Sequence, residues 1–247
     1  KLALVIKGIA DEDILDTYEV ERLPIIRFNV AQSVLNARRM EAAGLGGIMK
    51  THEDFREDDI ARMRDAIPGQ REHFEYYGQT FGYAYRSTLV FDEVNSAEPQ
   101  AINTYEATAA PGGRAPHCWL KLPERGTTIS TVDLFKDMRF TLLAGRDGQS
   151  WIEAYEKAAT RAGLRSHAYV VGANGDLLDH VGAFLDLYEI SPDGAVLVRP
   201  DGHVAWRARD ATCDVDQIMD QVIHAFASKR ERRGPSFPSS HQTKVAA

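Results

Sequence analysis

The sequence of 247 residues contains only two cysteines, Cys118 and Cys213, which are too few for a disulfide framework. Neither has a second cysteine or a paired histidine at zinc-ligand spacing, so no metal site is expected. No apolar run approaches the roughly 20 residues that cross a membrane. The formal net charge of −7 disfavours a nucleic-acid partner, which would need a basic surface. These absences favour a cytoplasmic protein that binds neither nucleic acid nor membrane.

Phosphate-binding signatures are also absent. No Gly-x-Gly-x-x-Gly follows a predicted strand, and no Gly-Lys-Ser/Thr loop is present to hold a nucleotide phosphate. A glycine-rich stretch at residues 44–47 follows a predicted helix, so no helix N-terminus faces a phosphate there. The chain therefore offers no recognisable nucleotide site of its own.

The first 80 residues are predicted to be mostly helical. Residues 1–9 form an apolar run with no N-cap residue before it, which favours a piece of a longer chain over a leader or tag. Apolar residues recur with a period near 3.6 over residues 23–37, which predicts a long helix. Glu21, just before them, is interpreted as part of a helix-start charge run. A second helix is predicted over residues 58–67, and the aromatic and β-branched residues 80–94 predict a strand.

From residue 114 onward, short strands and helices are predicted to alternate. Strands are predicted at residues 118–120, 139–144, 167–172, 195–199 and 203–207, a strand edge and turn at residues 129–134, and helices at residues 151–162 and 215–227. A β-α-β unit followed by ββα is the thioredoxin-like arrangement. A thioredoxin enzyme carries Cys-x-x-Cys at the start of its first helix, and this chain has none. The sequence therefore predicts an α/β fold that works without dithiol chemistry.

Composition predicts two domains and a tail. Residues 95–114 are polar and rich in Ala, Pro and Gly. They place a domain boundary between a helical part, residues 1–113, and a thioredoxin-like domain, residues 114–227. Residues 228–247 are basic and then rich in Pro and Ser, so they are expected to be disordered.

A few polar side chains are candidates for a site. They are His117 with Cys118, the pair Asp133 and Asp137, the trio Asp176, Asp179 and His180, and His203. His117 and Cys118 are neighbours on a predicted strand and point to opposite faces, so they are not expected to form a nucleophile pair. The two aspartates of the pair are interpreted as turn or cap residues.

The remaining candidates carry weak signals. Spacing alone allows the trio to be a metal or substrate cluster, and His203 is interpreted as a cross-strand pair on the surface. Aromatic residues Phe81, Tyr83 and Tyr85 are interpreted as core residues, with the edge of a substrate pocket as the alternative. We assign no catalytic, cofactor-binding or metal-binding residue from the sequence.

Several stretches, in one order, resemble the C-terminal half of the FAD-dependent aromatic-ring hydroxylases. They are residues 1–8 (KLALVIKG, like the end of the family's NLAWKL helix), 15–24 (LDTYEVERLP, like LLDTYEAERRP), 114–120 (RAPHCWL, like RAPHxWL), 129–135 (ISTVDLF, like STLDLF), 140–143 (FTLL) and 197–207 (LVRPDGHVAWR). The similar branch is the phenol hydroxylase-like group, which includes chlorophenol monooxygenases and polyketide hydroxylases. Together these stretches cover about residues 1–210.

The resemblance implies a flavoprotein that hydroxylates a phenolic substrate with NAD(P)H and O₂. In the family, the flavin does the chemistry and the protein supplies position and a water-poor pocket. The family's FAD-binding motifs and substrate-domain sheet would lie upstream of Lys1. The resemblance therefore implies that FAD is bound mainly by that upstream region, against which residues 1–78 would pack, and that a homodimer forms.

Two other interpretations remain open. The chain alone is also consistent with a stand-alone thioredoxin-like module for binding or dimerisation, without catalysis. A third interpretation is an independent enzyme that uses the region of His117 and Asp133.

Overall fold

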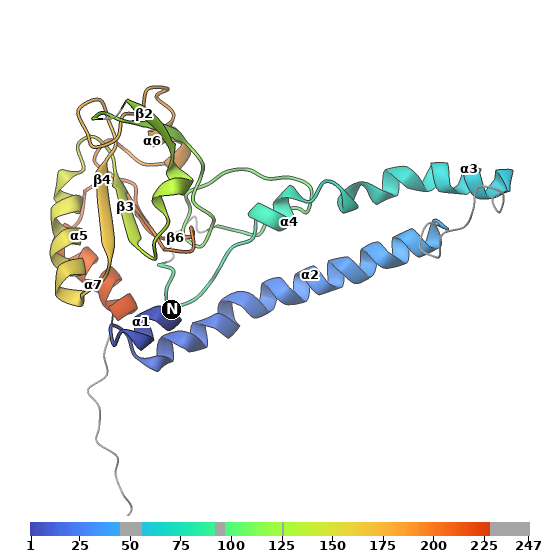
Figure 1. The fold of residues 1–247 in the computed structure, drawn as a ribbon, viewed down its shortest axis with the longest axis horizontal. Helices are drawn as coiled ribbons and strands as arrows, with labels where there is room; N and C mark the ends of the chain where they lie inside the picture. The colour runs from blue at the N-terminus through green and yellow to red at the C-terminus, as the bar shows by residue number, and fades with distance from the viewer. Residues whose placement is uncertain (45–55, 92–96, 125, 228–247) are drawn as a thin grey trace, which may run out of the picture.

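The computed structural model describes residues 1–44, 56–91, 97–124 and 126–227. A long helical hairpin leads into an α/β domain with a mixed sheet (Figure 1). This order confirms the predicted fold class. The predicted disordered tail, residues 228–247, lies outside the described residues.

The N-terminal part is helical, as the sequence predicts. Its elements are α1 (Leu2–Ile6), the 3-10 helix η1 (Glu12–Asp16), α2 (Thr17–Ala42), α3 (Glu57–Ala66), the 3-10 helix η3 (Ile67–His73) and α4 (Tyr77–Phe81). Pro24 lies inside α2, in its third turn, where it has no N–H to donate to the carbonyl four residues earlier, so α2 begins further before Pro24 than the sequence indicates. Figure 1 shows α2 and α3 running back along each other away from the sheet. The ion pair of Arg39 with Glu72 joins α2 to η3.

The long helix α2 exposes apolar side chains on several sides. Val20, Ile26 and Phe28 are 56%, 50% and 46% exposed. Successive residues of an α-helix turn by about 100°, so these three side chains point in three different directions. The periodic residues that predict the helix thus do not form a buried stripe within this chain. The buried residues of this helix are instead polar, namely Thr17, Glu21 and Gln32.

The strand predicted at residues 80–94 is wrong over the described residues. Residues 77–81 form α4, and residues 82–91 form a loop. The aromatic side chains that suggested a strand pack in ring contacts, such as Phe81 with Tyr105 and Tyr83 with Tyr85. A hydrogen bond from Tyr85 N to Gly112 O holds this loop to the segment just before the second domain, and one from Phe91 N to Ala205 O attaches it to that domain.

The second domain contains a four-stranded mixed sheet. Its strands are β3 (Phe140–Ala144), β4 (Ser166–Val170), β5 (Ala195–Val198) and β6 (Val204–Ala208), in the order β4-β3-β5-β6. β3 and β4 are parallel, whereas β5 is antiparallel to β3 and to β6. Together with α5 (Gln149–Ala162) and α7 (Val215–Ala227), this is the predicted β-α-β, ββα arrangement.

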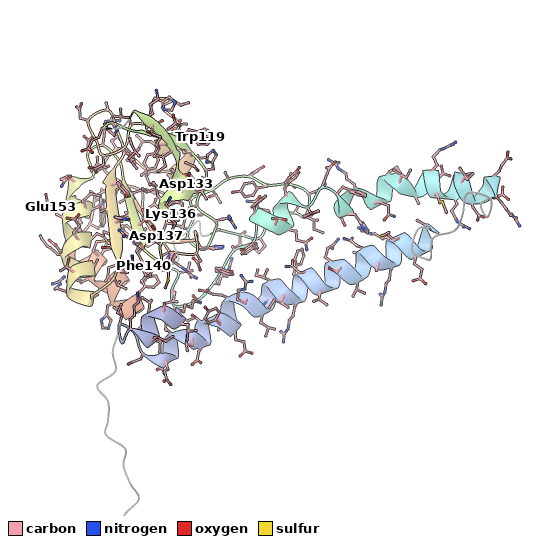
Figure 2. The ribbon with its side chains drawn as sticks, viewed as in Figure 1. Trp119, Asp133, Lys136, Asp137, Phe140 and Glu153 are labelled. Atoms are coloured by element: carbon pink, nitrogen blue, oxygen red, sulfur yellow. The ribbon has the colours of Figure 1, made fainter. Side chains whose placement is uncertain are left out.

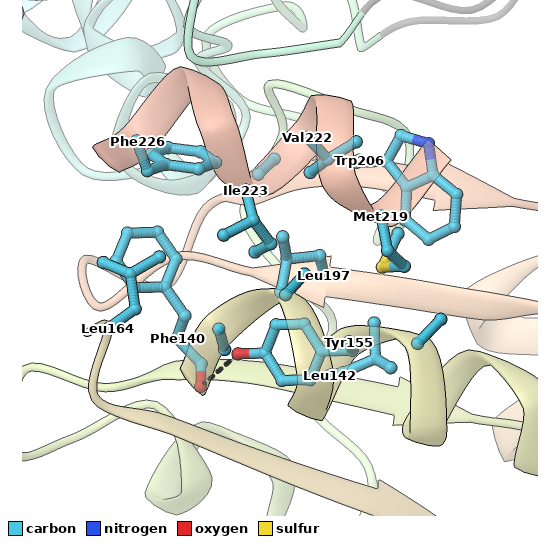
Figure 3. Packing of buried hydrophobic residues seen from close by; sticks show 14 of the residues in the cluster. Phe140, Leu142, Tyr155, Leu164, Leu197, Trp206, Met219, Val222, Ile223 and Phe226 are labelled. Carbon is cyan, nitrogen blue, oxygen red and sulfur yellow. Dashed lines mark hydrogen bonds between the residues drawn. The ribbon is translucent and has the colours of Figure 1, made fainter. Parts of the chain in front are cut away.

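Two apolar clusters cover the two faces of this sheet. On one face α5 and α7 pack over β3 and β5, and the hydroxyl of Tyr155 donates to the carbonyl of Phe140 at 3.0 Å (Figure 3). The short helix α6 (Phe184–Tyr188) contributes to the cluster on the other face. The antiparallel pair β1 (Trp119–Leu122) and β2 (Thr127–Ser130), with the 3-10 helix η4 (Thr131–Leu134), contributes there as well.

The N-terminal helix α1 packs on the first of these clusters through one side only. Leu4 and Val5 contact the cluster, whereas Leu2 and Ile6 are 54% and 76% exposed. The N-cap residue Lys1 makes no side-chain cap hydrogen bond. The predicted uncapped helix is therefore present, partly buried against the α/β domain.

Candidate functional site

A buried ion pair connects α2 to the turn between β5 and β6. The guanidinium of Arg199 donates to both oxygens of the Glu21 carboxylate, at 2.7 and 2.9 Å. The side chains are 4% and 2% exposed. Lys1 and Ser87 also donate to Glu21, at 2.5 and 2.6 Å. Four segments of the chain therefore meet at one carboxylate.

The environment of Glu21 keeps it ionised. Burial alone would raise the pKa of its carboxyl, but the hydrogen bonds and charge of Arg199, with the bonds from Lys1 and Ser87, lower that pKa to about 2. Asp201 accepts hydrogen bonds from Nε of Arg199 at 3.2 Å and from Nη2 at 2.5 Å. The guanidinium therefore donates to two carboxylates, those of Glu21 and Asp201.

Next to this network, Tyr85 and His203 form an aromatic stack. Their ring centroids are 4.2 Å apart, and the Tyr85 hydroxyl accepts from Arg22 of α2 at 2.6 Å. Nδ1 of His203 donates to the carbonyl of Gly112 at 3.1 Å. The prediction that His203 lies on the surface is wrong, because it is 2% exposed under the loop that carries Tyr83 and Tyr85. Burial lowers its pKa, against the opposing charge of Asp201.

A cavity of about 430 Å³ opens beside these groups. Its lining combines charged and aromatic residues with apolar ones and comes from α1, α2, the loop of Tyr85, the β5–β6 turn, β3 and α7. Sequence reasoning missed the charged residues, because Glu21 resembled a helix-start charge and Arg199 a turn residue. The available signal was a basic residue directly after the apolar strand Ala195–Val198.

A second cavity, of about 580 Å³, gathers three of the predicted candidates. Asp133, Asp137 and Asp176 line it, with His167 of β4 and Lys136. Figure 2 shows Asp133, Lys136 and Asp137 on the same side of the domain. Asp137 adopts a left-handed backbone conformation, with φ of 60°. Burial lowers the pKa of His167, whose Nε2 accepts from Arg139.

The other candidates have local structural partners. The carboxylate of Asp179 accepts from the N–H of Phe184 at 2.8 Å, next to the start of α6, so it does not join Asp176 in the cavity. His117 contacts Ser130 through Nδ1 and stacks edge-on against Trp119. Cys118 is buried, which raises the pKa of its thiol to about 11. The structure therefore does not bring His117 and Asp133 into one site.

Comparison with known proteins places these features in a family. Residues 108–228 match the family model described as aromatic-ring hydroxylase, C-terminal. The chain is 35% identical over 228 residues to 4-methyl-5-nitrocatechol 5-monooxygenase from Burkholderia sp., covering 91% of this chain and 37% of that enzyme. It is 31% identical over 255 residues to 2,4-dichlorophenol 6-monooxygenase from Cupriavidus pinatubonensis, covering 96% and 43%. The chain corresponds to the C-terminal region of the FAD-dependent aromatic-ring hydroxylases.

Solved structures agree with this assignment. The flavin-dependent monooxygenase PieE, solved in complex with FAD and substrate, superimposes with a TM-score of 0.73 at 32% identity, covering 91% of this chain and 42% of that one. This hydroxylase C-terminal region therefore spans about two fifths of the relatives it matches. The resemblance found in the sequence is confirmed.

Structural relatives bind FAD, and the turn from β3 into α5 is a strand-to-helix turn, a kind that can hold a phosphate at a helix N-terminus. That turn, residues 145–148, has a glycine at each end. Three of its N–H groups are already bonded, from Gly145 to Gly194 O, from Asp147 to Pro192 O and from Gly148 to Gly145 O. A Cβ on Gly145 would lie 2.3 Å from the carbonyl oxygen of Pro192. The turn therefore does not fit a pyrophosphate, and the hydroxylase C-terminal region lacks the FAD-binding region.

Two further findings concern metals and membranes. Among the residues that the structure describes, no three His, Cys, Asp or Glu side chains are grouped so that they could hold a metal ion. Within the same residues, no helix combines the length and the apolar composition needed to span a bilayer.

Proposed function

We propose that this chain is the C-terminal part of a flavin-dependent monooxygenase that hydroxylates a phenolic or related aromatic substrate with NAD(P)H and O₂. The observation that carries the proposal is the likeness to such enzymes over about nine tenths of the chain. The bonded turn at residues 145–148 supports the view that the chain alone does not hold FAD and does not catalyse.

The chain divides, in this proposal, at residue 113. Residues 1–113 complete the FAD and substrate domains, and residues 114–227 form a thioredoxin-like domain without dithiol chemistry. The partner is the upstream FAD-binding region. The large apolar side chains that α2 exposes on several sides support this, because contiguous exposed apolar surface is typical of a face that another domain or protein covers. A cytoplasmic homodimer completes the proposal.

A chimera tests this function. The C-terminal part of 4-methyl-5-nitrocatechol 5-monooxygenase is replaced by this chain, and the chimera is compared with the chain alone. The expected result is a yellow chimera that oxidises NAD(P)H and hydroxylates its aromatic substrate, and a colourless, inactive chain. Flavin bound by the chain alone would contradict the proposal.

The same preparation separates the alternative of a stand-alone module. Sedimentation of the chain alone reports its oligomeric state. A colourless, compact dimer, together with a chimera that binds no FAD, would favour the module.

A further inference from the structure

The cavity beside the Glu21–Arg199 pair has an apolar wall and a charged end. Its volume of about 430 Å³ lies in the range of small-molecule sites. Apolar and aromatic side chains line most of it, among them Leu4, Ile14, Leu89, Phe226, Tyr18 and Tyr85. Tyr85 is only 4% exposed, and Phe226 is 2% exposed. This wall suits a flat apolar ring, which gains free energy when it leaves water.

The carboxylates at the charged end are already engaged. Glu21 accepts two hydrogen bonds from Arg199 and one each from Lys1 and Ser87. Asp201 accepts from Arg199 and from the backbone N–H of His203. A cationic ligand would therefore find its possible partners occupied and would face two positive side chains.

Donors, in contrast, are in excess there. In the described part of the chain, the side chain of Arg22 has one hydrogen bond, to the Tyr85 hydroxyl, and the ammonium of Lys1 has one, to Glu21. A guanidinium carries five N–H donors and an ammonium three. Both side chains line the cavity. The hydrogen-bonding capacity left over is thus positively charged and donating, which suits an anion.

We propose that this cavity binds a small aromatic anion. Its ring lies against the apolar wall of Leu89 and Phe226, and its carboxylate accepts hydrogen bonds from Arg22 and Lys1. This site is separate from the flavin chemistry of the proposed function, because that chemistry is assigned to the upstream region, whereas all residues that line the cavity belong to this chain. Its test is therefore independent of whether the parent enzyme is a hydroxylase.

Binding of benzoate to the full chain, without flavin, is the test. Calorimetry gives the affinity, and amide NMR signals locate the site. Benzoate should shift the signals of Ala3, Ile14 and Leu89, which line the cavity. Benzamide keeps the ring and loses the charge, and acetate keeps the charge and loses the ring, so each should bind at least roughly tenfold more weakly.

Substitutions on α2 complete the test. Arg22→Gln should weaken benzoate binding by roughly tenfold, because a charge-assisted hydrogen bond is lost. Arg22→Lys keeps the positive charge, so it should weaken benzoate binding by less than Arg22→Gln does. Arg27→Gln is the matched control, because Arg27 is an exposed arginine of the same helix that does not line the cavity. Benzoate that shifts none of these signals, an Arg22→Gln protein with unchanged affinity, or acetate that binds as tightly as benzoate would overturn the proposal.

Discussion

Arg199 and Glu21 are 178 residues apart in the chain, yet they share two hydrogen bonds in the protein interior. This contact attaches α2 to the thioredoxin-like sheet at the turn after β5. A buried pair of this kind gains stability only while both charges are present, since each carboxylate or guanidinium has lost its water. The pair therefore couples the stability of the two parts of the chain.

Loss of one member of the pair should be costly. We expect Arg199→Met or Glu21→Leu to lower the free energy of unfolding by about 3 kcal/mol, because the remaining buried charge loses its bidentate partner and keeps only Lys1 and Ser87, or only Asp201. The double variant should lose less free energy of unfolding than the sum of the losses in the two single variants. Urea unfolding, followed by circular dichroism, measures these differences.

An exposed ion pair supplies the control. Arg161 of α5 contacts Asp220 of α7, and both side chains are more than half exposed. Arg161→Met should cost about 0–1 kcal/mol. If Arg199→Met costs no more than Arg161→Met, the buried pair does not stabilise the junction.

Acid should weaken the same junction. The pKa of Glu21 is about 2 in the folded protein, against an ordinary value of 4.5. Its ionised form therefore contributes fully above about pH 4.5, and the contribution disappears as the pH falls from there to about 2. The full effect is on the order of 3 kcal/mol. Urea midpoints measured across this range should fall with pH in the native chain and fall less in Glu21→Gln; equal slopes would contradict the assignment.

Much of the fold could be predicted from local sequence patterns. Apolar periodicity located α5 and α7, and apolar runs located β3, β5 and β6 to within a few residues. These elements bury the same residues that create the pattern, such as Leu142 and Ile223. The strand predicted at residues 80–94 was wrong because aromatic side chains there make ring contacts from a loop. Aromatic composition alone does not distinguish such a loop from a strand.

The contact between Glu21 and Arg199 could not be predicted from local sequence patterns. Glu21 and Arg199 each have an ordinary local explanation, as a helix-start charge and a turn residue. Only the tertiary fold brings them together, and no local spacing encodes a contact across 178 residues. Asp133, Asp137 and Asp176 illustrate the opposite case, because two separate predicted groups turned out to line one cavity.

The turn at Gly145 should reject any side chain. A Cβ there would lie 2.3 Å from the carbonyl oxygen of Pro192, which is backbone and has little freedom to move. We expect Gly145→Ala to lower the free energy of unfolding by about 1–3 kcal/mol or more. Gly69→Ala is the matched control, because nothing lies within 4 Å of the added methyl group, and alanine is favoured in a helical turn. A Gly145→Ala protein as stable as Gly69→Ala would show that the turn can open.

Limited trypsin digestion should distinguish the helical hairpin from the α/β domain. The hairpin exposes apolar residues and makes few contacts with the sheet, so its helices should open locally at a lower free energy. We expect the first cuts inside α2 and α3, at arginines such as Arg27 and Arg62. Lys157 and Arg161 of α5 are comparably exposed but lie on a helix packed against α7 and the sheet, so they serve as internal controls. Mass spectrometry of the fragments gives the order of cutting. Uniform resistance along the chain, or first cuts in α5, would mean that the hairpin is stable without a covering domain.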